Sequence, residues 1–244
     1  MVFGGNGFVG SRVCEVAHNM GLHVISINRS GPFLPPRTPR NCTHHTGRPA
    51  WLKKPWADDV EWMHGDALQP ACYIDKLRGA LGAVSCIGGF GSNATMYKVC
   101  GEANIKVIET AASVNVPRFA FISVYHDTLP GFVKQIGYFR GKMDAEAALQ
   151  RSFGSSGVTV RPFFIHGMRH ISESLGIPLQ AIGIPLEKAL SFVPNTKQLA
   201  TSIPLLGTGF VPPVKVESVA RAAVAGATDP ATASVLDVWD IAKF

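Results

Sequence analysis

Three residues in the middle of the chain have the types and spacing needed for carbonyl–alcohol chemistry. Tyr138 and Lys142 are four residues apart in "YFRGK", so on a helix they share one face. A tyrosine can donate a proton to a carbonyl or take one from an alcohol, and a nearby ammonium group lowers its pKa. Ser123 ends the apolar run "RFAFIS" and can hydrogen-bond the substrate oxygen. Asn104 is a candidate for holding Lys142 through a water molecule.

A glycine-rich turn opens the chain. The stretch "GGNGFVG" follows a short apolar run and precedes an amphipathic segment, which is the strand–turn–helix context of a dinucleotide-binding site. Glycines let the backbone N–H groups approach a pyrophosphate, and the helix that follows points its positive end at it. We therefore expect this turn to bind a dinucleotide. The residues expected at the cofactor are Gly4, Gly5, Gly7, Phe8, Val9 and Gly10.

The end of the second strand indicates which dinucleotide is bound. NAD sites usually carry an acidic residue about 20 residues after the glycines, where it holds the ribose 2′-hydroxyl. Here "INRSG" offers Arg29 and Ser30 and no acid, which favours NADP(H), with NAD(H) as the alternative if Arg29 only begins the basic segment that follows. Asp66 and Ala67 are expected near the adenine, although Asp66 is equally suited to cap a helix. Gly88 and Lys142 complete the predicted cofactor side.

These residues must be positioned by alternating strands and helices. Short apolar runs separated by helical stretches predict an α/β protein with a Rossmann-like, doubly wound parallel sheet and a small C-terminal cap. The predicted strands are residues 1–3, 23–27, 60–63, 83–89, 118–123, 158–165 and 235–240, and the predicted helices are 8–20, 94–115 and 134–152. The predicted units are a dinucleotide-binding domain at 1–170, the apolar cap at 171–214, and a return helix and strand at 215–244.

Two segments interrupt this alternation. Residues 29–56 form a basic, proline-rich insertion, with no acidic residue between 29 and 54. It is either a solvated insertion or an arm that docks on a protein complex or an anionic surface. Residues 174–214 carry only three charges, on Glu187, Lys188 and Lys197. This segment is either a buried cap, a lid over a lipophilic substrate, or a surface that meets a membrane or a protein.

Composition narrows the class of protein. The chain has 244 residues, a net charge of +6 and five scattered cysteines without a pairing pattern, which fits a reducing compartment. No apolar run reaches the length of about 18 residues that a membrane helix needs. A nucleic-acid partner is not expected, because no recognition motif accompanies the positive charge. No metal site is expected from "CTHH" (42–45). The very short first strand predicts that the chain is a processed form of a longer protein.

The motifs together resemble one enzyme superfamily over nearly the whole chain. "GGNGFVG", "FIS" and "YFRGK", with "CIGGFGSN" (86–93) and "RPFFIHGMR" (161–169), resemble the atypical, extended-like branch of the short-chain dehydrogenases/reductases. Within that branch the chain is most similar to organellar NAD(P)-binding proteins of plants and algae. These are related to a ubiquinone-biosynthesis-associated protein and to the Rossmann-type accessory subunit of respiratory complex I. The long basic insertion departs from this pattern, as do Tyr125 and His126, which replace small residues and are expected to crowd the substrate pocket.

The resemblance implies two alternative functions. One is an NADP(H)-dependent oxidoreductase acting on a lipophilic carbonyl or quinone-like substrate, with Ser123, Tyr138 and Lys142 in their family roles. The other is a non-catalytic NADP(H)-binding accessory subunit of a larger organellar complex, docked through its basic arm and peripheral to a membrane. The resemblance implies a mitochondrial location, on the matrix side of the inner membrane, with a plastid as the alternative.

Overall fold

A parallel sheet forms the centre of the molecule. The computed structural model describes residues 1–29, 51–170, 176–191, 193–202 and 207–244. Its main sheet has seven strands, all parallel, in the order β11-β6-β5-β4-β1-β2-β3. These strands are β1 (Val2–Phe3), β2 (Ile25–Asn28), β3 (Glu61–His64), β4 (Ala83–Ser85), β5 (Phe119–Ile122), β6 (Gly157–Val160) and β11 (Val235–Leu236). The strand order reverses between β1 and β4, which confirms the predicted Rossmann-like doubly wound sheet.

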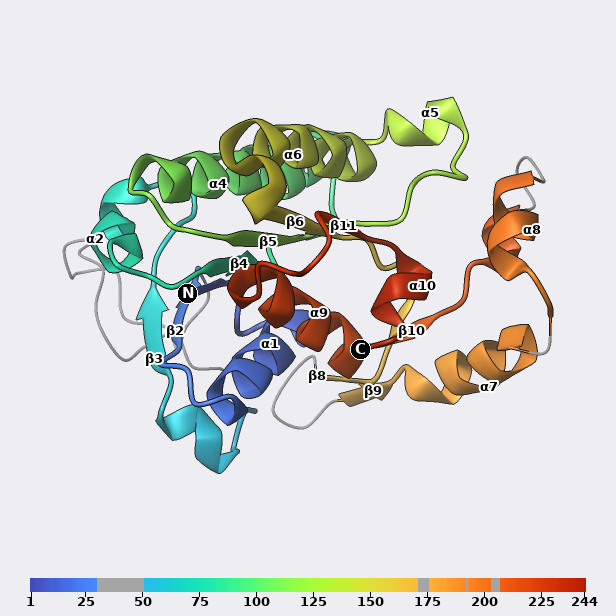
Figure 1. Ribbon diagram of the computed structural model, residues 1–244, viewed down its shortest axis with the longest axis horizontal. Coiled ribbons are helices and arrows are strands. Elements are labelled where there is room, and N and C mark those ends of the chain that lie inside the picture. The colour runs from blue at the N-terminus through green and yellow to red at the C-terminus, as the bar shows by residue number, and fades with distance from the viewer. Residues whose placement is uncertain (30–50, 171–175, 192, 203–206) are drawn as a thin grey trace.

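Helices cover both faces of this sheet (Figure 1). On one face lie α1 (Phe8–Asn19) and α9 (Val216–Thr228). On the other lie α6 (Gly137–Phe153) and a continuous helical stretch made of α3 (Asn93–Tyr97), a π-helical turn (Lys98–Glu102) and α4 (Ala103–Ser113). The shorter helices are α2 (Ile74–Leu77), α5 (Gly131–Lys134), α7 (Gln180–Ser191), α8 (Thr196–Ser202) and α10 (Val238–Ile241).

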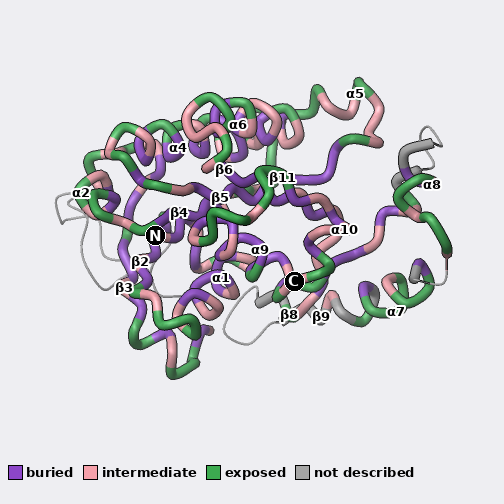
Figure 2. Tube along the Cα trace, viewed as in Figure 1, coloured by how far each residue is buried: buried purple, intermediate pink, exposed green. Residues whose placement is uncertain are grey.

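Strand alternation divides the core into two layers. In β5, Phe119 and Phe121 pack toward α4 and α6, whereas Ala120 and Ile122 pack toward α1 and α9. Successive side chains of a strand point to opposite faces, so this apolar strand supplies both layers. The strands are accordingly buried along most of their length, as the purple segments in Figure 2 show.

Several elements end earlier than predicted, each for a local reason. The strand predicted at 158–165 stops at Val160, because Pro162 has no N–H to continue the ladder, and a short strand β7 (Ile165–His166) follows. The strand predicted at 235–240 stops at Leu236, because Asp237 caps α10 with a capping box. β4 ends at Ser85, before the paired glycines.

The helix predicted at 134–152 begins only at Gly137, with α5 as a separate turn before it.

The remaining strands form two small sheets outside the main one. β7 pairs in parallel with β10 (Val214–Lys215), and β8 (Met168–His170) pairs antiparallel with β9 (Gly176–Pro178). The 3-10 turns are Pro55–Asp58, Pro70–Cys72, Gly154–Ser156 and Gly207–Phe210.

The charge-poor segment contains helices α7 and α8, which lie beyond α10 at one end of the sheet (Figure 1). His166 Nε2 lies 3.0 Å from Glu187 Oε2 of α7, and the Lys197 ammonium of α8 lies 2.5 Å from Asp237.

The predicted division into separate units stays a prediction, and residues 30–50 of the basic insertion lie outside the described part. None of the described helices is long and apolar enough to cross a membrane.

Candidate functional site

A cavity of about 410 Å³ opens at the carboxyl ends of β1, β2, β3 and β4. Six of the predicted cofactor residues line it, and they come from four different loops. These residues are Gly4, Gly7, Arg29, Asp66, Ala67 and Gly88. In open parallel sheets, ligands bind at the carboxyl ends of the strands where the strand order reverses, and this cavity lies at that point.

The glycine turn has the geometry of a tight strand-to-helix connection. Gly4 has φ +81°, a backbone conformation that other residues rarely adopt, and its N–H donates to the Ile27 carbonyl at 2.8 Å. A Cβ on Gly10 would lie 2.1 Å from the Gly4 carbonyl oxygen, so only glycine fits there. Gly7 precedes α1 and lines the cavity, which places the positive end of α1 next to it. Gly5, Phe8, Val9 and Gly10 do not line the cavity; Gly5 and Gly10 shape the turn.

Asn28, at the end of β2, is a further residue that contacts the glycine turn. The Asn28 side chain is 3% exposed; its Oδ1 accepts the Asn6 N–H at 2.9 Å and its Nδ2 donates to Ser26 at 3.1 Å. Asn28 therefore holds the glycine turn in place. It lies at the end of the second strand, where NAD sites usually carry an acidic residue that binds the ribose. Its place just before Arg29 was the signal in the sequence. Ser30 lies outside the described residues.

Asp66 lines the cavity, and its Oδ1 accepts the N–H of Leu68 at 3.0 Å. The carboxylate thus stabilises the turn after β3. It does not cap the 3-10 turn that follows, which begins after Gln69 without a side-chain cap. A contact between Asp66 and an adenine stays a prediction.

Asn104 and Lys142 meet at one backbone carbonyl. The Asn104 amide donates to the carbonyls of Ile87, Val99 and Cys100 at 3.3, 3.2 and 2.9 Å. Lys142 Nζ donates to Ile87 at 3.0 Å and to Ile122 at 2.6 Å. The two side chains are therefore linked by the Ile87 carbonyl, where a water had been predicted, and Asn104 also satisfies carbonyls of the π-helical turn.

Tyr138 and Lys142 differ from the predicted electrostatic pair. Burial lowers the pKa of Lys142 to about 8, and burial together with Cys100 raises the pKa of Tyr138 to about 12. The prediction that Lys142 lowers the Tyr138 pKa is wrong for this arrangement, because the ammonium group donates to backbone carbonyls. The Tyr138 ring instead stacks on Phe90, with centroids 5.1 Å apart and planes 10° apart.

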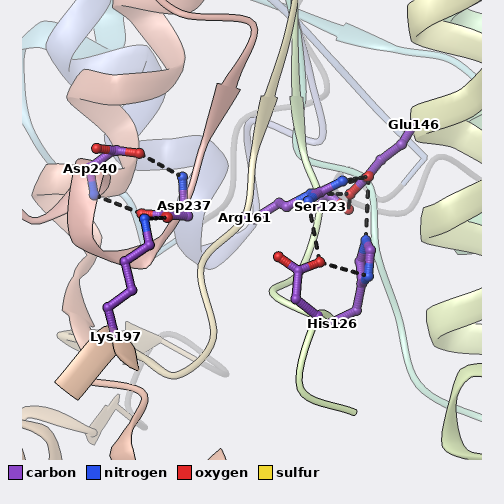
Figure 3. A network of polar contacts seen from close by, with 8 residues as sticks. Ser123, His126, Glu146, Arg161, Lys197, Asp237 and Asp240 are labelled. Carbon is purple, nitrogen blue, oxygen red and sulfur yellow. Dashed lines mark hydrogen bonds and ion pairs between the residues drawn. The ribbon is translucent and has the colours of Figure 1, made fainter. Parts of the chain in front are cut away.

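Ser123 belongs to a polar network that the sequence did not reveal (Figure 3). Its hydroxyl donates to Glu146, whose carboxylate also accepts Arg161 Nη2 at 2.5 Å and lies 3.4 Å from His126 Nε2. Burial alone would raise the Glu146 pKa, but hydrogen bonds from His126, Arg161 and Ser123 and the Arg161 charge bring that pKa below its usual value. The Ser123 hydroxyl thus donates its hydrogen bond to Glu146. The predicted acceptor of this hydrogen bond was a substrate oxygen.

Tyr125 and His126, which were expected to crowd the substrate pocket, are both buried. Tyr125 makes an edge contact with the Trp239 ring at 5.7 Å, and His126 Nε2 lies 3.4 Å from the Glu146 carboxylate that Ser123 also binds. That they crowd a substrate pocket stays a prediction. Glu146 is four residues beyond Lys142, so helical spacing could have identified it, but its partners come from the chain after β5 and after β6.

Comparison with known proteins places the chain among its relatives. No family model matches it. It is 36% identical over 229 residues to an uncharacterized chloroplastic protein of Arabidopsis thaliana, covering 94% of this chain and 71% of that protein. The chain belongs to the family of this Arabidopsis protein. A shorter stretch of 88 residues, 36% of the chain and 27% of the relative, is 34% identical to MIOREX complex component 2 of Saccharomyces cerevisiae.

The fold also occurs in more distant solved structures. The enzyme WbmH of Bordetella bronchiseptica, in complex with NAD+, superposes with a TM-score of 0.60 at 16% identity, covering 97% of this chain and 73% of that one. In this chain the N-terminal end of α1 and the Arg29 side chain both lie at the cavity, and such groups attract phosphate. Lys142 lies next to Gly88, which lines the cavity, since a Cβ on Gly88 would lie 3.7 Å from Lys142 Nζ. The described residues contain no cluster of metal-ligating side chains, and Cys42, His44 and His45 lie outside them.

Proposed function

We propose that the protein binds NADP(H) in this cavity and acts as an oxidoreductase of the short-chain dehydrogenase/reductase type. One observation carries the proposal: the cavity combines a glycine turn at the start of α1 with the carboxyl ends of four parallel strands, where the strand order reverses. The shared fold with WbmH, whose structure contains NAD+, supports a nicotinamide dinucleotide.

The preference for NADP(H) rests on the end of β2. The strand ends in Asn28, so it presents no carboxylate to a ribose. The Asn28 side chain hydrogen-bonds Asn6 and Ser26. Arg29 follows it and lines the cavity. A guanidinium can donate two hydrogen bonds to a phosphate, whereas a carboxylate at this position would repel the phosphate.

Tyr138 is the proposed proton donor. With a pKa near 12, its phenol keeps its proton at neutral pH and can deliver it to an oxygen that gains negative charge. A bound reduced nicotinamide would supply the hydride. The aromatic surroundings of Tyr138, with Phe90 stacked on it and Phe139 at 5.2 Å, support a lipophilic carbonyl or quinone-like substrate.

Titration of the purified protein with NADPH and NADH, followed by nicotinamide fluorescence, tests the cofactor. We expect NADPH to bind more tightly than NADH. Gly7→Asp should weaken both by more than about 100-fold, because a carboxylate then faces the phosphates. Gly131→Asp, at a position with open space around it, is the matched control and should bind as the wild type does. A wild-type protein that binds neither nucleotide would refute the proposal.

A second candidate is a dinucleotide-binding subunit of a larger assembly. It is favoured by the Ser123 hydroxyl, which is committed to Glu146, and by the name of the yeast relative, a complex component. Native mass spectrometry of the protein isolated from its source distinguishes the two. A free chain carrying NADP(H) supports the enzyme, and a chain found only with other proteins supports the subunit.

We propose a plastid location, because the Arabidopsis relative is named chloroplastic. The mitochondrial location implied by the sequence resemblance stays a prediction. Imaging of the full-length protein fused to a fluorescent tag, against plastid and mitochondrial markers, decides between them.

A further inference from the structure

A second basic side chain lines the dinucleotide cavity besides Arg29. Lys98 lies on the helical stretch between α3 and α4, and Arg29 follows β2. Both residues line the same cavity, although they are 69 positions apart in the sequence. Lys98 is exposed and forms no ion pair with another residue that the structure describes. Its charge is therefore available to an anion in the cavity.

The helical stretch lines the cavity with Lys98, Val99 and Ala103. Lys98 begins the π-helical turn Lys98–Glu102, which holds one residue more than an α-turn. Asn104 binds the loosened carbonyls of Val99 and Cys100. Tight packing fixes the turn against α6, because a Cβ on Gly101 would lie 2.9 Å from Gly141 Cα.

The charges around the cavity favour an anion. Arg29 and Lys98 contribute two positive charges, and Asp66 contributes one negative charge that is partly satisfied by the Leu68 N–H. The N-terminal end of α1, at Gly7, adds a partial positive charge. Arg29 and Lys98, which come from different elements, thus both bring positive charge to one cavity, which suits a ligand that carries more than one phosphate.

We propose that Lys98 is a second phosphate ligand of the bound dinucleotide, in addition to Arg29. This rests on the proposed function, since it assigns a residue to the same site. Lys98 determines how tightly the dinucleotide is held, and its ammonium donates to a phosphate oxygen.

The test compares Lys98→Met with Lys106→Met in the full chain. Lys106 lies on the same helical stretch, is exposed and does not line the cavity, so its substitution removes the same charge without touching the site. NADPH and NADH affinities are measured by fluorescence titration at one fixed salt concentration. We expect Lys98→Met to weaken NADPH binding on the order of tenfold, Lys98→Arg to retain most of it, and Lys106→Met to match the wild type.

Each outcome has a defined meaning. Weakening of NADPH alone supports the inference and assigns Lys98 to the 2′-phosphate, and equal weakening of NADPH and NADH supports it and assigns Lys98 to the pyrophosphate. Affinities of Lys98→Met within twofold of the wild type overturn the inference but leave the proposed function standing. A wild-type protein that binds neither nucleotide removes the proposed function itself, and the inference with it.

Discussion

At the scale of single residues, Lys142 shows how burial changes the chemistry of a side chain. Its ammonium group is 3% exposed and donates to the carbonyls of Ile87 and Ile122, with the Phe121 ring 4.6 Å away. These neutral partners offset only part of the loss of water, so the Lys142 pKa falls to about 8. A lysine near its pKa at neutral to mildly basic pH can hold or release a proton.

The lowered pKa predicts a pH-dependent stability. The unfolded state keeps the Lys142 proton up to about pH 10.5, whereas the folded state releases it near pH 8, so stability rises with pH between these values. Relative to Lys142→Met, the wild-type free energy of unfolding should therefore increase by roughly 3 kcal/mol from pH 7.5 to 10.5. Urea denaturation of both proteins across this range measures it. A difference that does not change with pH would contradict the assigned pKa.

At the scale of one element, α6 presents three functional groups on one face. Tyr138, Lys142 and Glu146 are spaced four residues apart, so they line up along the helix and meet three different neighbours. Tyr138 meets Phe90, Lys142 meets the ends of β4 and β5, and Glu146 meets Ser123 and Arg161. The helix thereby fixes the loops after β5 and β6 relative to the cavity.

Replacing Glu146 by Gln should destabilise the fold. The Arg161 side chain is only 19% exposed and would lose its nearer charge partner while keeping Asp127 at 3.5 Å, which predicts a loss of roughly 2 kcal/mol in the free energy of unfolding at pH 7. Because the folded-state pKa of Glu146 is lowered, this difference is full above pH 4.5 and shrinks as the pH falls below it.

The exposed Glu109 of α4 provides the matched control, and Glu109→Gln should change stability by less than about 0.5 kcal/mol. Equal stability of Glu146→Gln and the wild type at pH 7 would show that the network contributes nothing to folding.

At the scale of the whole molecule, the segment with α7 and α8 is held to the sheet body at a few points. Buried His166 pairs with Glu187, and Gly183 allows α7 to approach the His166 ring, since a Cβ there would lie 2.2 Å from His166 Cβ. The Trp239 indole N–H donates to Thr196 of α8 at 3.1 Å, beside the exposed Lys197–Asp237 pair. Exposed pairs contribute little, so we expect the His166–Glu187 contact to contribute more to this attachment than the Lys197–Asp237 pair does.

Glu187→Gln should therefore loosen α7 without unfolding the sheet. Hydrogen exchange followed by mass spectrometry should show α7 amides exchanging several times faster, with β4 and β5 unchanged, because the segment opens locally. Glu109→Gln, the same chemical change on α4, should leave both regions as they are. Unchanged exchange in α7 would mean that apolar packing alone holds the segment.

The sequence by itself determined the fold class and the cavity. Apolar runs of strand length between helical stretches predicted the parallel sheet, and "GGNGFVG" marked the turn, because both depend on local periodicity and on backbone conformations that only glycine adopts. Gly4, Arg29 and Asp66 meet at the cavity as predicted, since the carboxyl ends of parallel strands share one edge.

Only the tertiary structure decided how the polar groups are used. Ser123 donates to Glu146, Lys142 donates to backbone carbonyls, and Lys98 lines the same cavity as Arg29. These arrangements join residues from separate elements, and the π-helical turn that begins at Lys98 packs on α6 where Gly101 meets Gly141. Spacing along the chain places a side chain on a face of its own helix, but partners and burial, which set its pKa and its hydrogen bonds, come from the elements packed against it.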